Sequence, residues 1–147
     1  MVAPDHKIII DKGSDYQILI QVPETNMSIK DVRGWTWTFK IYNQGKGPDS
    51  PELYKTYSMS CPAYTNDLNS LDYTNDYDEI QAANGWVNIR IDASDTATLL
   101  TGISAEVDSF ATEYNYRYTI DIVDGNVTPG LDSEEIRILR GRCAIRN

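Results

Sequence analysis

Apolar and polar residues alternate along most of this chain with a period of two. The alternation is clearest in four segments, residues 15–22, 34–42, 85–92 and 113–124. In the second of these, one face carries four large apolar side chains, those of Trp35, Trp37, Phe39 and Ile41. Because successive side chains of a strand point to opposite faces of a sheet, this pattern predicts half-buried antiparallel strands.

Three weaker strands and one helix complete the expected fold. The weaker strands are predicted at residues 7–10, 54–60 and 135–145. The phase of the last one slips near Gly141, which indicates a bulge there. A short helix is predicted at about 94–101, with Ser94 as its N-cap, Gly102 beyond its C-terminus and Leu99 buried across an end of the sheets. We therefore expect a single all-β domain over residues 1–147, an Ig-like antiparallel β-sandwich of about seven strands with one short crossing helix.

Two connections are longer than joining strands requires. Residues 43–53 contain two glycines and two prolines and are expected to form a flexible hairpin tip. Residues 61–84 form a 24-residue segment rich in Asn, Asp and Tyr, with little periodicity, and are expected to be a loop. Long connections in small domains tend to be functional. We expect three tyrosines of this loop to contact a partner, namely Tyr64, Tyr73 and Tyr77.

The charge balance narrows the class of partner. The 147 residues include 13 Lys+Arg and 22 Asp+Glu, a net charge of −9, which disfavours nucleic acid and anionic membranes. The chain has a single histidine, His6, which excludes any metal site or mechanism that needs two imidazoles. Cys61 and Cys143 fit reduced, buried thiols of a cytosolic protein. No window approaches the ~20 apolar residues of a membrane span, and the N-terminus has no signal-peptide core.

Catalytic and metal chemistry find weak support in the sequence. The acidic residues lie mainly in turns and on polar strand faces such as that of Asp121, which indicates a solvated surface rather than a catalytic carboxylate pair. We expect no enzyme and no cofactor. Calcium is a weak alternative, because the 61–84 loop offers four carboxylates without the EF-hand spacing. These candidate ligands are Asp67, Asp72, Asp76 and Asp78.

Two further surface roles are left open by the pattern. A carbohydrate-binding module would need Trp35 and Trp37 exposed, whereas their register with Phe39 favours the core. Arginines recur along the last predicted strand, at positions 137, 140, 142 and 146. They fit either a charged edge strand that resists aggregation or a contact with an acidic partner, for which Arg140 and Arg142 are the candidates.

Four short motifs occur in an order that resembles a known family of phage proteins. Residues 8–16 resemble its I-D-x-G-x-D/T-hydrophobic start, and residues 91–100 resemble its short S-x-x-x-T-x-x-L helix. Residues 116–122 are similar to its Y-x-Y-D-I strand, and residues 138–145 to its closing hydrophobic-L-x-G-x-hydrophobic strand. This family consists of β-sandwich modules of phage virions and includes the N-terminal domains of baseplate upper proteins.

The resemblance implies a non-enzymatic bacteriophage virion structural protein, present in many copies and bound to the major capsid protein or to tail or baseplate proteins. Family members usually have a short connection where this chain has residues 61–84, and many carry further domains after the closing strand. We therefore expect an auxiliary or head-decoration capsid protein, made in the bacterial host cytoplasm and located in the virion. A tail, baseplate or connector adaptor is the alternative, and the 61–84 segment is the expected docking element.

Overall fold

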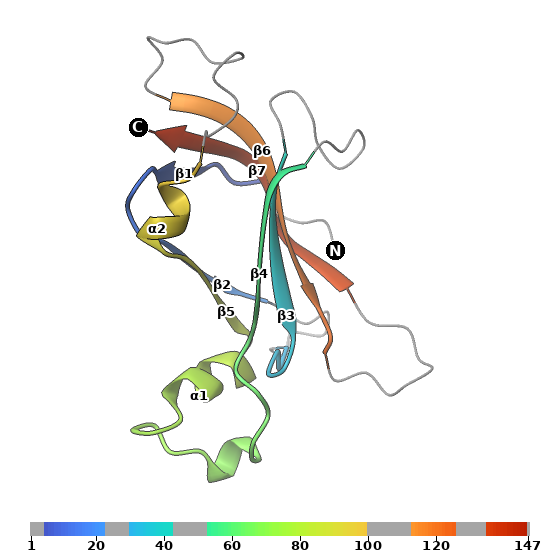
Figure 1. Ribbon diagram of the computed structural model, residues 1–147. Coiled ribbons are helices and arrows are strands. Elements are labelled where there is room, and N and C mark those ends of the chain that lie inside the picture. Colours follow the sequence, from blue (N-terminus) through green and yellow to red (C-terminus); the bar gives the residue numbers. More distant parts are fainter. Residues whose placement is uncertain (1–4, 23–29, 43–52, 100–112, 126–134, 147) are drawn as a thin grey trace.

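Two sheets lie against each other with the apolar core between them (Figure 1). The computed structural model describes residues 5–22, 30–42, 53–99, 113–125 and 135–146. Within these ranges the strands are β1 (Ile8–Asp11), β2 (Tyr16–Gln21), β3 (Thr36–Tyr42), β4 (Leu53–Ser60), β5 (Trp86–Ile91), β6 (Glu113–Val123) and β7 (Glu135–Arg146). Each of the seven overlaps a predicted strand, which confirms the secondary-structure pattern.

The pairing of the strands matches an Ig-like sandwich. One sheet has the order β1-β7-β6-β3-β4, and the other pairs β2 with β5. This division separates the second and fifth strands from the third, sixth and seventh, as in immunoglobulin domains. All pairs are antiparallel except β1 with β7, which is parallel. The all-β fold class is confirmed, with this one parallel pair as a departure from the expected antiparallel sheets.

Strand β7 is not an edge strand. It lies between β1 and β6, so the interpretation of its arginines as charges that protect an open edge is wrong. The reason is that the N-terminal strand β1 pairs along its whole length with the end of β7, from Ile8 opposite Cys143 to Asp11 opposite Arg146. The described edges of this sheet are therefore β1 and β4.

The predicted inner faces meet around Phe39. Its ring stacks on Tyr118, with 5.6 Å between ring centroids, and meets Tyr16 and Tyr57 edge-on at 6.4 and 6.3 Å. Tyr16 belongs to the other sheet, so this aromatic cluster joins the two layers. Such pairs add about 0.5–1.5 kcal/mol each beyond their buried area.

The outer face of the five-stranded sheet is partly covered. Asp121 was expected on a solvated face but is 2% exposed, and Thr119 on the same face is 1% exposed. Arg137 donates to Asp121 at 2.9 Å, and the hydroxyls of Tyr42 and Thr119 are 3.4 Å apart. Neighbouring side chains across three strands therefore bury these polar groups and provide their partners.

Gly141 allows the N-terminal segment to pass close to β7, and it does not form the bulge of that strand. The bulge lies at Ile138, which is skipped where Ile120 pairs with Leu139 and Asp121 with Arg137. Gly141 has φ +145°, and a side chain there would collide with the backbone of His6. The segment is held in place by His6, whose amide donates to the Arg140 carbonyl at 2.8 Å.

The predicted helix is present but begins earlier. Helix α2 spans Ala93–Thr96 with Asp92 as its N-cap, so Ser94 lies inside the helix rather than capping it. Leu99, predicted to be buried by this helix, is fully buried just beyond it. The expected terminator Gly102 and the 43–52 part of the predicted hairpin tip lie outside the described residues. No helix within the described ranges has the length and apolarity that crossing a bilayer requires.

Candidate functional site

The 61–84 segment is folded and not an open loop. It joins β4 to β5 at one end of the sheets, and is drawn in green in Figure 1. It contains a 3-10 turn, η1 (Leu68–Ser70), and a helix, α1 (Tyr77–Ala83). The expectation of an irregular loop is therefore wrong for residues 77–83. Helix α1 has only two buried apolar residues, Ile80 and Ala82, which is too few to leave a helical period in the sequence.

A buried arginine ties this segment to the sandwich. Arg33, which precedes β3, is 4% exposed and donates to Asp31 at 2.7 Å and to Glu79 of α1 at 2.8 Å. The same guanidinium donates to the backbone carbonyl of Asn66 at 2.6 Å. One planar group thereby joins the strand entry, the segment and the helix. Hydrogen bonds to Asp31 and then to Glu79 raise the Arg33 pKa above its ordinary value.

Glu79 holds Arg33 from the helix side, and Arg33, Asp31, Glu79 and the Asn66 carbonyl are together called the anchor below. Its carboxylate accepts from the Thr65 hydroxyl and from the Thr65 amide, the latter at 3.2 Å. The Thr65 hydroxyl and then Arg33 lower the pKa of Glu79, so the carboxylate is charged at neutral pH. The ring of Tyr64 lies over the Arg33 guanidinium, whose central carbon is 3.9 Å from the centroid of the ring. The anchor is therefore a layered structure with Arg33 at its centre.

The three predicted contact tyrosines all lie on the surface of this folded segment. Tyr73 is 76% exposed, Tyr77 55% and Tyr64 53%. Tyr64 is the most constrained, because it stacks on Arg33 and its hydroxyl donates to Asp67 at 2.6 Å. This hydrogen bond raises the Tyr64 pKa. The segment is held in place by the anchor, and its three tyrosines expose apolar ring surface to solvent. Leu68 adds a further exposed apolar side chain.

Three of the four candidate calcium ligands, Asp67, Asp72 and Asp76, accept local hydrogen bonds. Asp72 accepts from the Thr74 amide and the Asn75 side chain, both at 2.8 Å, and the Asp76 carboxylate accepts from the Asp72 amide at 2.9 Å. Asp67 accepts from Tyr64. No group of three metal-ligating side chains occurs within the described residues. These carboxylates act here as acceptors for turn amides and neighbouring side chains, and the Asp76 carboxylate makes no capping hydrogen bond to α1.

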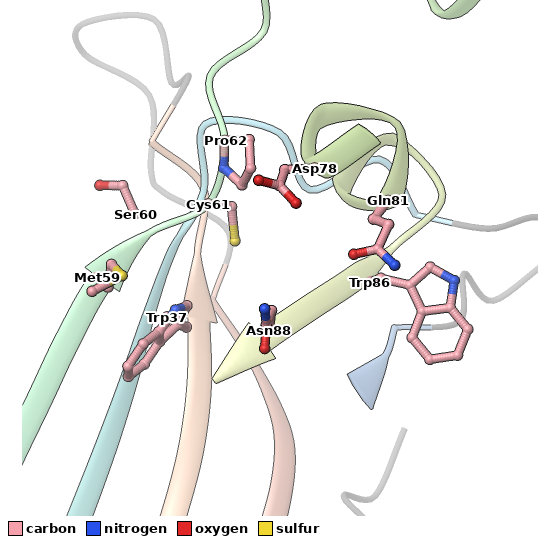
Figure 2. A pocket seen from close by; sticks show the side chains of 9 residues that line it. All are labelled: Trp37, Met59, Ser60, Cys61, Pro62, Asp78, Gln81, Trp86 and Asn88. Atoms are coloured by element: carbon pink, nitrogen blue, oxygen red, sulfur yellow. The ribbon is translucent and has the colours of Figure 1, made fainter. Parts of the chain in front are cut away.

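A cleft opens between this segment and the sheets (Figure 2). Its volume is about 270 Å³, and it lies between the end of β4, helix α1 and strand β5. The lining residues are Trp37, Met59, Ser60, Cys61, Pro62, Asp78, Gln81, Trp86 and Asn88. Figure 2 shows Gln81 reaching from α1 toward Asn88 on β5, with Asp78 beside Pro62 and the Cys61 thiol across the space.

The cleft offers polar contacts rather than an activated nucleophile. Burial raises the pKa of Cys61 to about 11, so its thiol stays protonated at neutral pH. Gln81 donates to the Tyr77 hydroxyl at 3.0 Å, and Asn88 accepts from Gln17 at 2.8 Å. Of the described acids, Glu79 and Asp121 are buried, and each is paired with an arginine on a different part of the fold.

The two tryptophans considered for sugar binding belong to the core. Trp35 is 4% exposed and Trp37 is 2% exposed, so neither presents an indole face to a ligand. The prediction that both rings face the core is confirmed. Trp86, half-buried at the rim of the cleft, points its indole away from the polar groups in Figure 2. A carbohydrate module built on Trp35 and Trp37 is therefore excluded.

Arg140 and Arg142, the other predicted contact residues, lie on the outer face of the five-stranded sheet. Both are exposed, and Arg142 is directly opposite Arg117 of β6. Arg117 and Lys40 were not predicted as part of a site, because their proximity to β7 depends on strand register. The same applies to Arg33 and Glu79, which are 46 residues apart. The alternation in 113–124 does place Arg117 on an outer face, and this was the available signal.

Comparison with known proteins adds no assignment. No protein-family model matches the chain, and no curated protein is similar to it.

Proposed function

We propose that this protein is a non-enzymatic structural component of a bacteriophage particle that binds its neighbours through the 61–84 segment. The observation that carries this proposal is the anchored display of tyrosines. Arg33, which is also paired with Asp31, fastens the segment at Asn66 and Glu79, while Tyr73 and Tyr77 stay mostly exposed. Tyrosine offers large contact area at low entropy cost, and an already folded segment loses little further freedom on binding.

The family and the place in the particle come from sequence motifs. The resemblance of residues 8–16, 91–100, 116–122 and 138–145 to phage sandwich modules supports the virion assignment, and the Ig-like sandwich is compatible with it. In the proposed auxiliary or head-decoration protein, the long 61–84 segment, where that family has a short connection, is the docking element. A tail, baseplate or connector adaptor is the alternative. Locating the protein on intact particles by antibody labelling separates the shell from the tail.

The test removes tyrosine side chains without disturbing the anchor. A double variant, Tyr73→Ala with Tyr77→Ala, leaves Arg33 and all its acceptors in place. Because both rings are exposed, unfolding free energy should change by no more than about 0.5 kcal/mol per site. Incorporation into particles should fall at least tenfold, measured by quantitative mass spectrometry of purified virions.

The matched control is Leu19→Ala, an exposed apolar residue on β2, 43% accessible and outside the segment. It should be incorporated normally. Normal occupancy of the double tyrosine variant would refute the proposed docking role of the segment.

A further inference from the structure

Four cations gather on the outer face of the five-stranded sheet, in two neighbouring cross-strand rows. In one row Tyr42, Arg117 and Arg142 are register partners, and in the next Lys40, Thr119 and Arg140. Lys40, Arg117, Arg140 and Arg142 are called the cationic face below. The three arginines are exposed, and Lys40 is half-buried.

This arrangement is unfavourable in an isolated copy. Arg117 and Arg142 are directly opposite each other, and like charges in that position destabilise a sheet. Asp121, the nearby buried acid on the same face, is already paired with Arg137 at 2.9 Å. A chain with net charge −9 nevertheless concentrates four positive charges here. An acidic surface placed against this face would relieve the repulsion.

The 61–84 segment has the complementary chemistry. It contains five acidic residues and no Lys or Arg. Asp67, Asp72 and Asp78 are exposed among its tyrosines. Aromatic rings also receive guanidinium groups, as Tyr64 does with Arg33 at 3.9 Å within this chain. The segment can therefore offer the cationic face both carboxylates and aromatic rings.

The two surfaces of one copy lie too far apart to meet. The segment leaves β4 after Ser60, whose register partner on β3 is Thr36. The cationic face occupies the rows of Lys40 and Tyr42, four to six residues further along β3. At about 3.3 Å per residue, the separation along the strand is roughly 13–20 Å. Any contact between these surfaces must therefore join different copies.

We propose that the 61–84 segment of one copy docks on the cationic face of a second copy of this chain. This inference rests on the proposed function, since it assigns a partner to the same docking segment. The contact is heterologous, because two different surfaces meet, and it propagates into rings or filaments according to the rotation between copies. A nucleic acid is disfavoured as the occupant, because the net charge of −9 on the chain would repel a polyanion.

Two charge variants test the contact in solution. The face variant combines Arg117→Glu with Arg142→Glu, and the segment variant combines Tyr73→Ala with Asp78→Lys. Sedimentation velocity is measured over a concentration series at about 0.1 M salt and again at about 0.5 M, where screening is stronger. The wild-type chain should form oligomers beyond the dimer at the lower salt. At the higher salt its association should weaken at least tenfold.

Each variant alone should sediment as the 16.6 kDa monomer. A 1:1 mixture of the two variants should form a dimer that grows no further, because it contains one intact segment and one intact face. Monomeric wild type at every concentration, or unchanged association of either variant, would overturn the proposal. So would fluorescence anisotropy showing that the face binds a single-stranded oligonucleotide while the face variant self-associates normally.

The same variants in particles separate this inference from the proposed function. Loss of incorporation in both variants supports self-docking. If only the segment variant is lost, the segment binds another virion protein, and the self-docking inference fails while the proposed function stands. If the segment variant is incorporated normally, the proposed function fails.

Discussion

Replacing Gly141 by alanine tests whether the N-terminal segment is held as the structure describes. A Cβ at this position would lie 2.8 Å from the Asp5 carboxylate and closer still to the His6 carbonyl oxygen. The backbone there also has φ +145°, which side chains rarely adopt. The substitution therefore adds both backbone strain and a clash with main-chain atoms that cannot rotate away.

The clash is relieved only if the N-terminal segment retreats from β7. Two hydrogen bonds would then be lost, from the His6 amide to the Arg140 carbonyl at 2.8 Å and from the Tyr118 hydroxyl to the His6 carbonyl at 2.5 Å. The lost His6–Arg140 hydrogen bond is worth about 1 kcal/mol, and the buried Tyr118 hydroxyl left without its acceptor costs about 1–3 kcal/mol. With about 1 kcal/mol of backbone strain, we expect destabilisation of roughly 3–5 kcal/mol.

Gly13→Ala is the matched control. Gly13 also has a positive φ, +83°, but nothing lies within 4 Å of a Cβ placed there. It should cost only about 1 kcal/mol, since it carries the strain without the clash. Urea unfolding followed by tryptophan fluorescence gives both values, and hydrogen exchange should show faster exchange of the His6 amide in Gly141→Ala. Equal costs for the two variants would refute this account of the N-terminal segment.

Further predictions concern the core, the thiols and the anchor. Trp37→Ala should lower the free energy of unfolding in urea by about 3–5 kcal/mol, because the indole is 2% exposed. Its cross-strand partner Met59 is 56% exposed, so Met59→Ala should lower it by less than about 1 kcal/mol. Similar losses for the two variants would mean that the inner face is wrongly assigned. Burial raises the pKa of Cys61 to about 11 and of Cys143 to about 12, so a disulfide reagent at pH 8 should label both thiols rapidly only after unfolding in urea; rapid labelling of the native protein would contradict this. Because the folded state lowers the pKa of Glu79, its contribution to stability is present above the unfolded value near 4.3 and is lost as pH falls through the lower folded pKa. Unfolding free energy measured from pH 6 to pH 2 should therefore fall less in Glu79→Gln than in the wild type, and parallel curves would refute the assignment.

The strands and their inner faces could be predicted from the sequence because a period of two is a local property. Trp35, Trp37, Phe39 and Ile41 are buried together, as their spacing indicates. Leu99 is likewise buried beside the short helix, as expected. The exposed tyrosines could also be located, since a segment rich in Asn and Asp offers them few apolar neighbours.

The tertiary structure decided everything that depends on which strands are neighbours. The parallel pairing of β1 moves β7 from an edge into the sheet and makes Gly141 necessary. The Arg33–Glu79 anchor joins residues 46 positions apart, and the cationic face combines residues of β3, β6 and β7. Such contacts leave no periodic trace, because pairing and register are set by the whole core rather than by adjacent residues. Sequence alone therefore located the surface tyrosines, whereas only the fold brought together the charges that anchor and complement them.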